Sequence, residues 1–363
     1  MAFSDLNSLF LSAEYRLPYL EADDTRSFLH LFTERMRRFT DDLKEIDELA
    51  YKTADKDIIV ADVEALASNL KSVLRLYLDG YPSEAYAHFK SVVEGDPFFQ
   101  DLNYSRLIRV DGDTPFFRSK KCHSIAFGAH GCVNDFSATV TGEEMFHVPF
   151  EKRRSIGTNR YSIPGFPCIY LSDHLQTSWS ECMSTDSEPF YAICYRNHRP
   201  LYLIDLVPLN VIMEQNGGQV PDGLFSSMTP EQALLNYALV YPIICACHSK
   251  INYMEAFSGE VKFRSEYIIP QLLMQWYRER QLVVDGIRYL SCTAESKFTG
   301  ITFDKHNFVI PVDECLESGL CPSLLMNFSA TPVYLYQNAT RKSIEAMLND
   351  IQSDLLASAV TPL

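Results

Sequence analysis

The feature that most limits what this chain can fold into is a change of apolar pattern near Gly95-Asp96-Pro97. Before that point, apolar residues recur every three or four positions, which is the spacing of amphipathic helices. After it, short β-like runs alternate with helical stretches without a regular β-α-β order. The sequence therefore predicts an α+β protein, with a helical N-terminal domain over residues 1–100 and a mixed β-sheet domain over residues 101–363.

The elements expected on either side of this change differ in kind. The N-terminal part predicts three helices, at about 25–39 after a cap at Asp24-Thr25, at 58–78 before Gly80, and in a short stretch after Ser83. The later part predicts strands at 168–172, 190–195, 201–206, 286–291, 307–312 and 333–336. Helices are expected between them at 173–183, 230–247 and 266–280, and at the end of the chain at 342–357.

The net charge limits the partners of the protein. It is −15 at pH 7. A surface this acidic repels the phosphate backbone, so general binding to nucleic acid is not expected. The densest basic cluster is Lys152-Arg153-Arg154, with Arg160 close behind. This cluster is either a solvated face or a guide that draws an anionic small molecule toward a site.

Cysteine usage indicates a cytoplasmic protein. Ten cysteines are scattered without a regular framework, which is typical of reduced, buried thiols. No run reaches the roughly 18 apolar residues that a membrane-spanning helix needs, and residues 1–15 lack the pattern of a signal peptide. The run Cys245-Ala246-Cys247-His248 has metal-ligand residue types, but its single spacer residue and the lack of a second cluster favour a packed helix. No metal is expected.

Residues with catalytic potential gather between positions 144 and 181. Arg160 and Ser162 precede a turn, Tyr170 lies in the strand that follows, and Glu181 lies on the next predicted helix. From spacing alone, the same residues could form a structural Arg–Glu pair beside a core tyrosine. His147 also has two interpretations, as a site residue or as a core histidine.

These residues resemble the signature of the RES-domain family. The first matching piece is Phe116-Phe117-Arg118, which resembles the family's opening strand. The others, in order, are the run 160–165 with Tyr170 and Glu181, the run 285–291, and the run 307–311. The match covers roughly Arg118 to Val312, and the ordered set is far more specific than any single piece. The resemblance implies a fold similar to that of ADP-ribosyltransferases. It also implies degradation of NAD⁺ by hydrolysis or phosphorolysis, usually by growth-arresting toxins that an antitoxin restrains.

The resemblance also implies roles for individual residues. Cleavage of the bond between nicotinamide and ribose builds positive charge on the ribose, and Glu181 is expected to stabilise it. Arg118 and Arg160 are expected to bind the pyrophosphate, because a guanidinium group suits phosphate oxygens. The expected catalytic residues are Glu181, Arg160 and Tyr170, and the expected NAD⁺-binding residues are Arg118, Tyr161, Ser162 and Ser291.

The chain departs from compact members of that family in three ways. Tyr161-Ser162 stands where many members have a bulkier aromatic residue and an asparagine. Ser291 follows Glu181 by 110 positions, so extra elements are expected to remodel the pocket. The helical N-terminal part is also extra, and it is expected to serve regulation, binding of a partner, assembly into a homo-oligomer, or packing on the catalytic domain.

The function predicted from these motifs is depletion of NAD⁺ by a toxin or anti-phage defence effector. NAD⁺ is the expected substrate, with no further cofactor, and an antitoxin or regulatory protein is the expected partner. Two alternatives remain. The protein could transfer ADP-ribose to a macromolecule, or it could sense NAD⁺ or a related nucleotide without turning it over.

Overall fold

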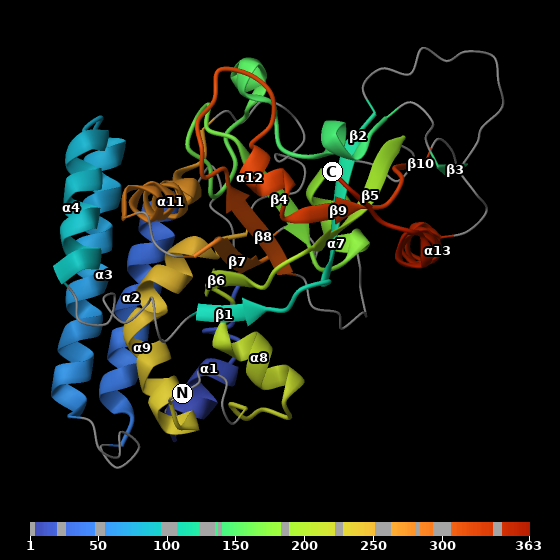
Figure 1. Ribbon diagram of the computed structural model, residues 1–363. Coiled ribbons are helices and arrows are strands. Elements are labelled where there is room, and N and C mark those ends of the chain that lie inside the picture. The colour runs from blue at the N-terminus through green and yellow to red at the C-terminus, as the bar shows by residue number, and fades with distance from the viewer. Residues whose placement is uncertain are drawn as a thin grey trace.

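Helices line one side of a mixed β-sheet in the computed structural model (Figure 1). The structure describes residues 4–19, 27–47, 55–95, 107–122, 135–136, 140–182, 189–221, 228–250, 263–280, 284–292, 306–336 and 343–363. The predicted α+β class is confirmed. The boundary predicted near residue 100 lies outside the described residues.

The N-terminal part forms the helices α1 (Leu6–Leu11), α2 (Phe28–Glu45), α3 (Lys56–Leu78) and α4 (Pro82–Gly95). The helices that follow are α6 (Gly142–Met145), η2 (Phe150–Ser155), α7 (Leu175–Cys182), α8 (Leu209–Gln215), α9 (Pro230–Cys247), η3 (Ser265–Tyr267), α11 (Ile268–Arg280), α12 (Pro322–Leu325) and α13 (Ile344–Ala357). The strands are β1 (Leu107–Val110), β2 (Pro115–Lys121), β3 (Asp135–Phe136), β4 (Cys168–Ser172), β5 (Phe190–Asn197), β6 (Leu201–Asp205), β7 (Gly286–Leu290), β8 (His306–Pro311), β9 (Phe328–Ala330), β10 (Tyr334–Tyr336) and β11 (Thr361–Pro362).

The long N-terminal helices begin and end where their sequences favour it. Ser27 caps α2 by accepting a hydrogen bond from the backbone N–H of His30, so the cap lies just after the predicted Asp24-Thr25, which is outside the described residues. Asp55 caps α3 in the same way, and α3 ends before Gly80, whose φ is +90°. The apolar face of α2 is buried, as its periodicity predicts.

Within the described residues, eleven strands form one sheet, and its main path runs β1-β6-β7-β8-β4-β2-β5-β10-β3. Neighbours pair antiparallel except β6 and β7, which pair in parallel. Gly286 allows β7 to approach β8, because a Cβ atom there would lie 2.2 Å from the carbonyl oxygen of Val309.

One apolar core joins the N-terminal helices to helices from the later part of the chain. Helix α9 is apolar on all sides and almost entirely buried, as expected for a helix with neighbours all around it. It packs on α2 and α3, while α11 packs on α3 and α4 (Figure 1). The core also takes in Ile287 of β7 and Val309 of β8. The helices of residues 6–95 therefore cover the same side of the sheet as α9 and α11.

Two smaller cores complete the protein, and β2 contributes to both of them. Phe116 packs in a core with Phe146 and Phe328, whereas Phe117 packs in another with Trp179 of α7 and Leu348 of α13. Successive side chains of a strand point to opposite faces, which explains this division. Helices α7 and α13 therefore lie against the sheet at a distance from the N-terminal helices (Figure 1).

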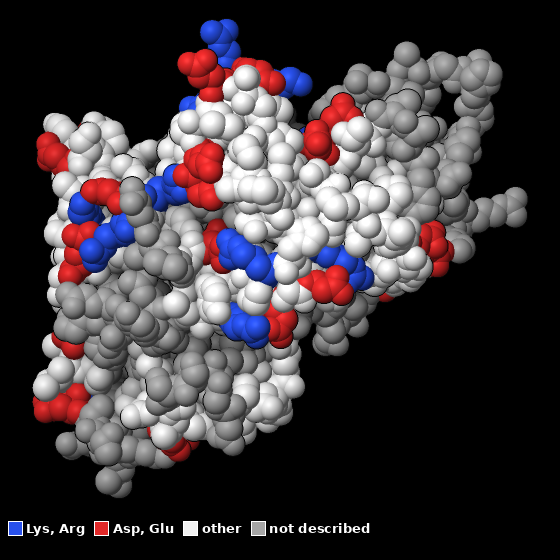
Figure 2. All heavy atoms as spheres, viewed as in Figure 1, with Lys and Arg blue, Asp and Glu red and all other residues white. Residues whose placement is uncertain are grey.

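Two general predictions can be compared with the described residues. None of the described helices has the length and apolar character needed to cross a bilayer. No disulfide joins any of the nine described cysteines, six of which are buried. On the face shown in Figure 2, basic and acidic side chains lie close together, so the described residues there form no continuous basic field.

Candidate active site

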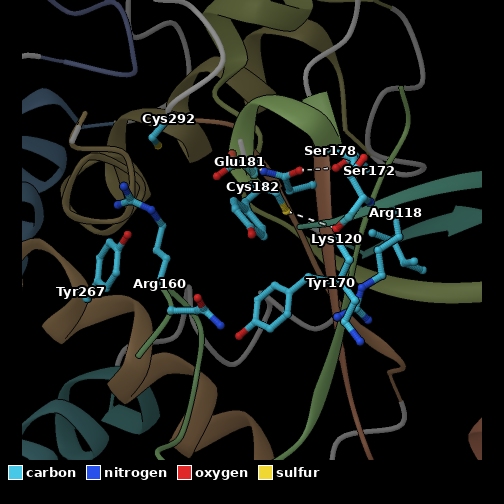
Figure 3. Close-up of a pocket in the computed structure, with 15 residues that line it drawn as sticks. Arg118, Lys120, Arg160, Tyr170, Ser172, Ser178, Glu181, Cys182, Tyr267 and Cys292 are labelled. Atoms are coloured by element: carbon cyan, nitrogen blue, oxygen red, sulfur yellow. Dashed lines mark hydrogen bonds between the residues drawn. The ribbon is translucent and has the colours of Figure 1, made fainter. Parts of the chain in front are cut away.

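A cavity of about 250 Å³ opens where β2 and β4 separate. The two strands pair only at Phe117 and Ser172, and beyond that pair they diverge. Arg118 and Lys120 of β2 line the cavity, as does Tyr170 of β4. Four of the seven predicted site residues, Arg118, Arg160, Tyr170 and Glu181, line this one cavity (Figure 3).

The carboxylate of Glu181 is oriented by two hydrogen bonds to the same oxygen. The Oγ of Ser291 donates to its Oε1 at 2.6 Å, and the Nδ2 of Asn307 donates to it at 2.8 Å. The Oγ of Ser172 donates in turn to the Oδ1 of Asn307 at 2.7 Å, which fixes the orientation of that amide. Glu181 itself is exposed to the cavity and to solvent. A rigid, accessible carboxylate is what stabilisation of a cationic transition state requires.

Arg160 is buried at the opposite side of the cavity from Glu181 and Tyr170 (Figure 3). Its Nη1 donates to the carbonyl oxygen of Cys247 at 3.2 Å, and its Nη2 donates to that of Ser249 at 2.8 Å. Its Cζ lies 5.0 Å from the ring centroid of Tyr267. Neutral carbonyl groups and a ring face hold the guanidinium in place without cancelling its charge, so it stays available to an anion.

Two cations lie on the same face of β2. The Nη1 of Arg118 donates to the carbonyl oxygen of Phe146 at 2.7 Å, and the Nζ of Lys120 donates to that of Glu144 at 2.7 Å. Burial lowers the pKa of Arg118 below its usual range. Burial, together with the nearby charge of Arg118, lowers the pKa of Lys120 to about 8. A phosphate group placed between them would offset the cost of burying both charges.

Tyr170 presents its ring to the cavity as a neutral phenol. Its hydroxyl donates to the carbonyl oxygen of Tyr161 at 3.2 Å. Burial raises the pKa of Tyr170 well above its ordinary value, so the hydroxyl stays protonated at neutral pH. Its ring and that of Tyr267 approach the cavity from different elements, which gives two aromatic surfaces for a planar ligand (Figure 3).

Three predicted binding residues lie behind the cavity wall. Tyr161 is fully buried and its ring packs on Tyr289 with centroids 4.5 Å apart. The Oγ of Ser162 accepts from the backbone N–H of Asn159 at 2.9 Å and donates to its carbonyl oxygen at 3.0 Å. Ser291 reaches the site through Glu181. Tyr161 and Ser162 therefore shape the turn that carries Arg160, and the geometry gives no support to direct contact with a ligand.

Several residues that line the cavity or orient its side chains were not predicted from the sequence, namely Lys120, Ser172, Tyr267, Tyr289 and Asn307. Lys120 could have been predicted from the sequence, because it follows Arg118 by two positions in a strand and must therefore lie on the same face. Asn307 begins the run already matched to the RES signature. Tyr267 could not be predicted, since it comes from the long segment between Glu181 and Ser291, in which no motif was matched.

The other candidate residues have structural roles. His147 is buried: its Nε2 accepts from the backbone N–H of Cys321 at 2.9 Å, and its Nδ1 lies 2.9 Å from the carbonyl oxygen of Val148. Cys245, Cys247 and His248 are buried at the end of α9. The described residues contain no group of histidine, cysteine and acidic side chains that could hold a metal. Residues 152–154 lie in η2, outside the residues that line the cavity.

Comparison with known proteins gives one distant relative. It is a protein of Bacillus subtilis (strain 168) named "Putative toxin YopC". The two sequences are 28% identical over 302 residues, which is 79% of this chain and 61% of the relative. The chain thus spans about three fifths of that protein. No family model and no solved structure matches the chain. The resemblance to the RES-domain family therefore stays a prediction from the motifs.

Proposed function

We propose that this protein cleaves NAD⁺ at the bond between nicotinamide and ribose. The observation that carries the proposal is the convergence of Glu181, Arg160, Arg118 and Tyr170 on one cavity, from four separate segments of the chain. A scatter of these residues over unrelated surfaces would have removed the basis for a dinucleotide site. The donor set combines cations, an oriented carboxylate and aromatic rings, which are the groups that a dinucleotide with an anionic pyrophosphate requires.

The proposed mechanism assigns each group a separate part of the substrate. Arg118 and Lys120 bind the pyrophosphate from one side, and Arg160 does so from the other. Tyr170 and Tyr267 hold the nicotinamide ring by stacking. As nicotinamide leaves with the bonding electron pair, positive charge develops on the ribose, and the Glu181 carboxylate stabilises it. Water or phosphate then attacks the ribose carbon and yields ADP-ribose or its phosphate.

The similarity to a protein named as a putative toxin supports a proposal for the role of this activity in the cell. A RES-type enzyme that depletes NAD⁺ would arrest the growth of the cell that contains it. The proposal therefore includes a toxin or defence role and a partner protein that restrains the activity.

The proposal is tested by incubating the purified protein with labelled NAD⁺ and following the products. Replacing a group that stabilises transition-state charge costs about 10²–10³-fold in rate, so Glu181→Gln should lower NAD⁺ loss by that factor. Glu317→Gln is the matched control, because Glu317 is exposed and remote from the cavity residues. NAD⁺ loss by Glu181→Gln at the wild-type rate would refute the assignment.

The label also separates the competing activities. Free ADP-ribose or its phosphate supports NAD⁺ degradation, label on a macromolecule indicates transfer, and binding without loss indicates a sensor. In cells, expression of the wild type should lower NAD⁺ and stop growth, whereas expression of Glu181→Gln at an equal level should do neither.

A further inference from the structure

A second cavity lies about the first turns of α2, apart from the candidate active site. Its volume is about 830 Å³, within the range of sites that hold small molecules. Residues 13–19 form one wall and α2 forms another. Four cationic side chains, Arg16, Arg35, Arg38 and Lys250, line it together with two carboxylates. Such a lining is unexpected in a chain with a net charge of −15.

Arg35 differs from the other arginines of this cavity in its partners. Arg16 forms an ion pair with Glu214, and Arg38 forms one with Glu34 at 3.1 Å. Arg35 donates from Nε to the hydroxyl of Tyr241 at 3.0 Å and from Nη2 to the carbonyl oxygen of Arg16 at 3.1 Å.

The guanidinium of Arg35 also lies over an aromatic ring. Its Cζ is 4.7 Å from the ring centroid of Tyr19. In the part of the chain that the structure describes, no carboxylate forms an ion pair with Arg35. A partly buried cation held by neutral groups is costly until an anion joins it. A planar guanidinium fixed by stacking is pre-organised for an oxyanion.

The chemistry of the lining defines the class of ligand. Several cations around one recessed guanidinium suit a ligand with more than one negative charge, and phosphate oxygens match the geometry of arginine. The volume leaves room for an organic part beside Leu31 and Pro18. The acidic protein as a whole repels anions, so binding here would depend on this cavity.

A short series of contacts connects this cavity to Arg160. The backbone N–H of Tyr19 donates to the carbonyl oxygen of His248 at 3.1 Å, and that of Lys250 donates to the carbonyl oxygen of Tyr19 at 2.9 Å. The carbonyl oxygens of Cys247 and Ser249, in the same segment, accept the two hydrogen bonds of Arg160. Tyr19 therefore touches both the second cavity and the segment that positions the candidate catalytic arginine.

We propose that this second cavity binds a small molecule bearing phosphate groups through Arg35, and that occupancy changes the affinity of the active site for NAD⁺ through residues 247–250. The effect on NAD⁺ rests on the proposed function, whereas the binding site does not. Binding and activity are therefore measured separately.

The test uses calorimetric titration of the full chain with inorganic pyrophosphate and with ADP. Because either probe could also enter the active site, the titration is repeated with Arg118→Gln. We expect binding that survives Arg118→Gln and weakens at least about tenfold in Arg35→Met, the factor for loss of a hydrogen bond to a charged group. Arg37→Met is the matched control, since Arg37 lies on the same helix, is exposed and does not line the cavity. Arg35→Lys keeps the charge, and should retain part of the affinity if Arg35→Met fails to fold.

The outcomes decide the two halves of the proposal separately. If binding is lost in Arg118→Gln but kept in Arg35→Met, the probes bind in the active site and the proposed second site is overturned. The second site is also overturned if the wild type binds neither probe. For the coupling, the affinity of Glu181→Gln for NAD⁺ is measured with and without the probe. Linkage requires the two affinities to change by the same factor, so an unchanged affinity overturns the coupling while leaving the binding site intact.

Discussion

Glu181 receives both of its hydrogen bonds on one carboxylate oxygen, and this determines how the carboxylate presents itself to the cavity. Ser291 and Asn307 donate to Oε1 from the ends of neighbouring strands, so the side chain is held by the sheet rather than by its own short helix. Ser172 fixes the amide of Asn307, which makes Asn307 a positioning residue as well as a residue of the cavity wall.

Asn307→Asp should therefore disturb Glu181 without changing the shape of the site. The change removes a donor and places two carboxyl groups within hydrogen-bonding distance, so the pKa of one of them must rise. We expect kcat for NAD⁺ at pH 7 to fall by about 10–100-fold, with the optimum pH displaced, because a hydrogen bond to a charged group is lost. The pH profile is the measurement. The control variant Asn327→Asp, outside the cavity, should leave the pH profile unchanged. If Asn307 had only a structural role, Asn307→Asp would leave the profile unchanged as well.

Lys120 gives the candidate site a pH dependence of its own. Its pKa is lowered to about 8 by burial and by the charge of Arg118, so it is protonated below that pH and neutral above it. In the proposed mechanism, the attraction of Lys120 for the pyrophosphate of NAD⁺ is thus present below pH 8 and lost as the pH rises through this value.

The KM for NAD⁺ should accordingly rise by about tenfold between pH 7 and pH 9.5, the effect of losing one charge-assisted contact. In Lys120→Met the KM should be high and independent of pH over the same interval. A wild-type KM that stays constant between pH 7 and pH 9.5 would show that Lys120 does not bind the substrate.

At the scale of elements, the cavity exists because two strands that the sequence predicts do not stay paired. The matched motifs place Arg118 and Tyr170 on strands, and both predictions of position are confirmed. The separation of β2 from β4 after one pair could not be predicted, since it depends on β5 holding β2 along its full length. The parallel pairing of β6 with β7 could not be predicted from the sequence either, because the helices α8, α9 and α11 lie between the two strands in the chain.

That parallel pair is joined by a buried ion pair whose removal should destabilise the sheet. Arg288 of β7 donates from Nε to Oδ1 of Asp205 at 3.0 Å and from Nη2 to Oδ2 at 2.7 Å. Oδ1 also accepts from the backbone N–H of Val207, and Asp205 is fully buried. Asp205→Ala leaves a charge and a backbone donor uncompensated, so unfolding should become easier by about 3–5 kcal/mol.

Chemical denaturation measures this loss directly. The exposed pair of Arg37 and Asp41 is the comparison, and Asp41→Asn should change the stability far less, because solvent screens an exposed pair. Equal effects of Asp205→Ala and Asp41→Asn would mean that burial does not strengthen the pair between β6 and β7.

At the scale of the whole molecule, the N-terminal helices and the long segment between Glu181 and Ser291 are parts of one structure. The segment between Glu181 and Ser291 contributes α9 and α11, and these helices bury their apolar sides against α2, α3 and α4. The sequence predicts both groups of helices but not the contact between them, because an amphipathic pattern shows which face is buried and not which element covers it. The same segment supplies Tyr267 and the carbonyl groups that hold Arg160, so the extra helices help to form the candidate site.

This shared core predicts that the N-terminal helices and the sheet unfold together. The chain has two tryptophans, and both are buried: Trp276 of α11 lies in the core shared with α3, and Trp179 of α7 lies in the separate core beneath α13. The variants Trp179→Phe and Trp276→Phe each leave one tryptophan, whose fluorescence reports on the core that contains it. Leu74→Ala in α3 removes a fully buried side chain and should destabilise the protein by about 2–5 kcal/mol.

If the protein unfolds as a single unit, Leu74→Ala lowers the denaturation midpoint of both tryptophan signals by the same amount. Leu348→Ala in α13, made as the matched change in the other core, should do likewise. A shift confined to Trp276 in the first variant and to Trp179 in the second would show two independent domains. In that case a chain that lacks residues 1–100 should fold and consume NAD⁺, whereas a single cooperative unit predicts that this shortened chain aggregates, because the faces of α9 and α11 that α2, α3 and α4 cover would meet water.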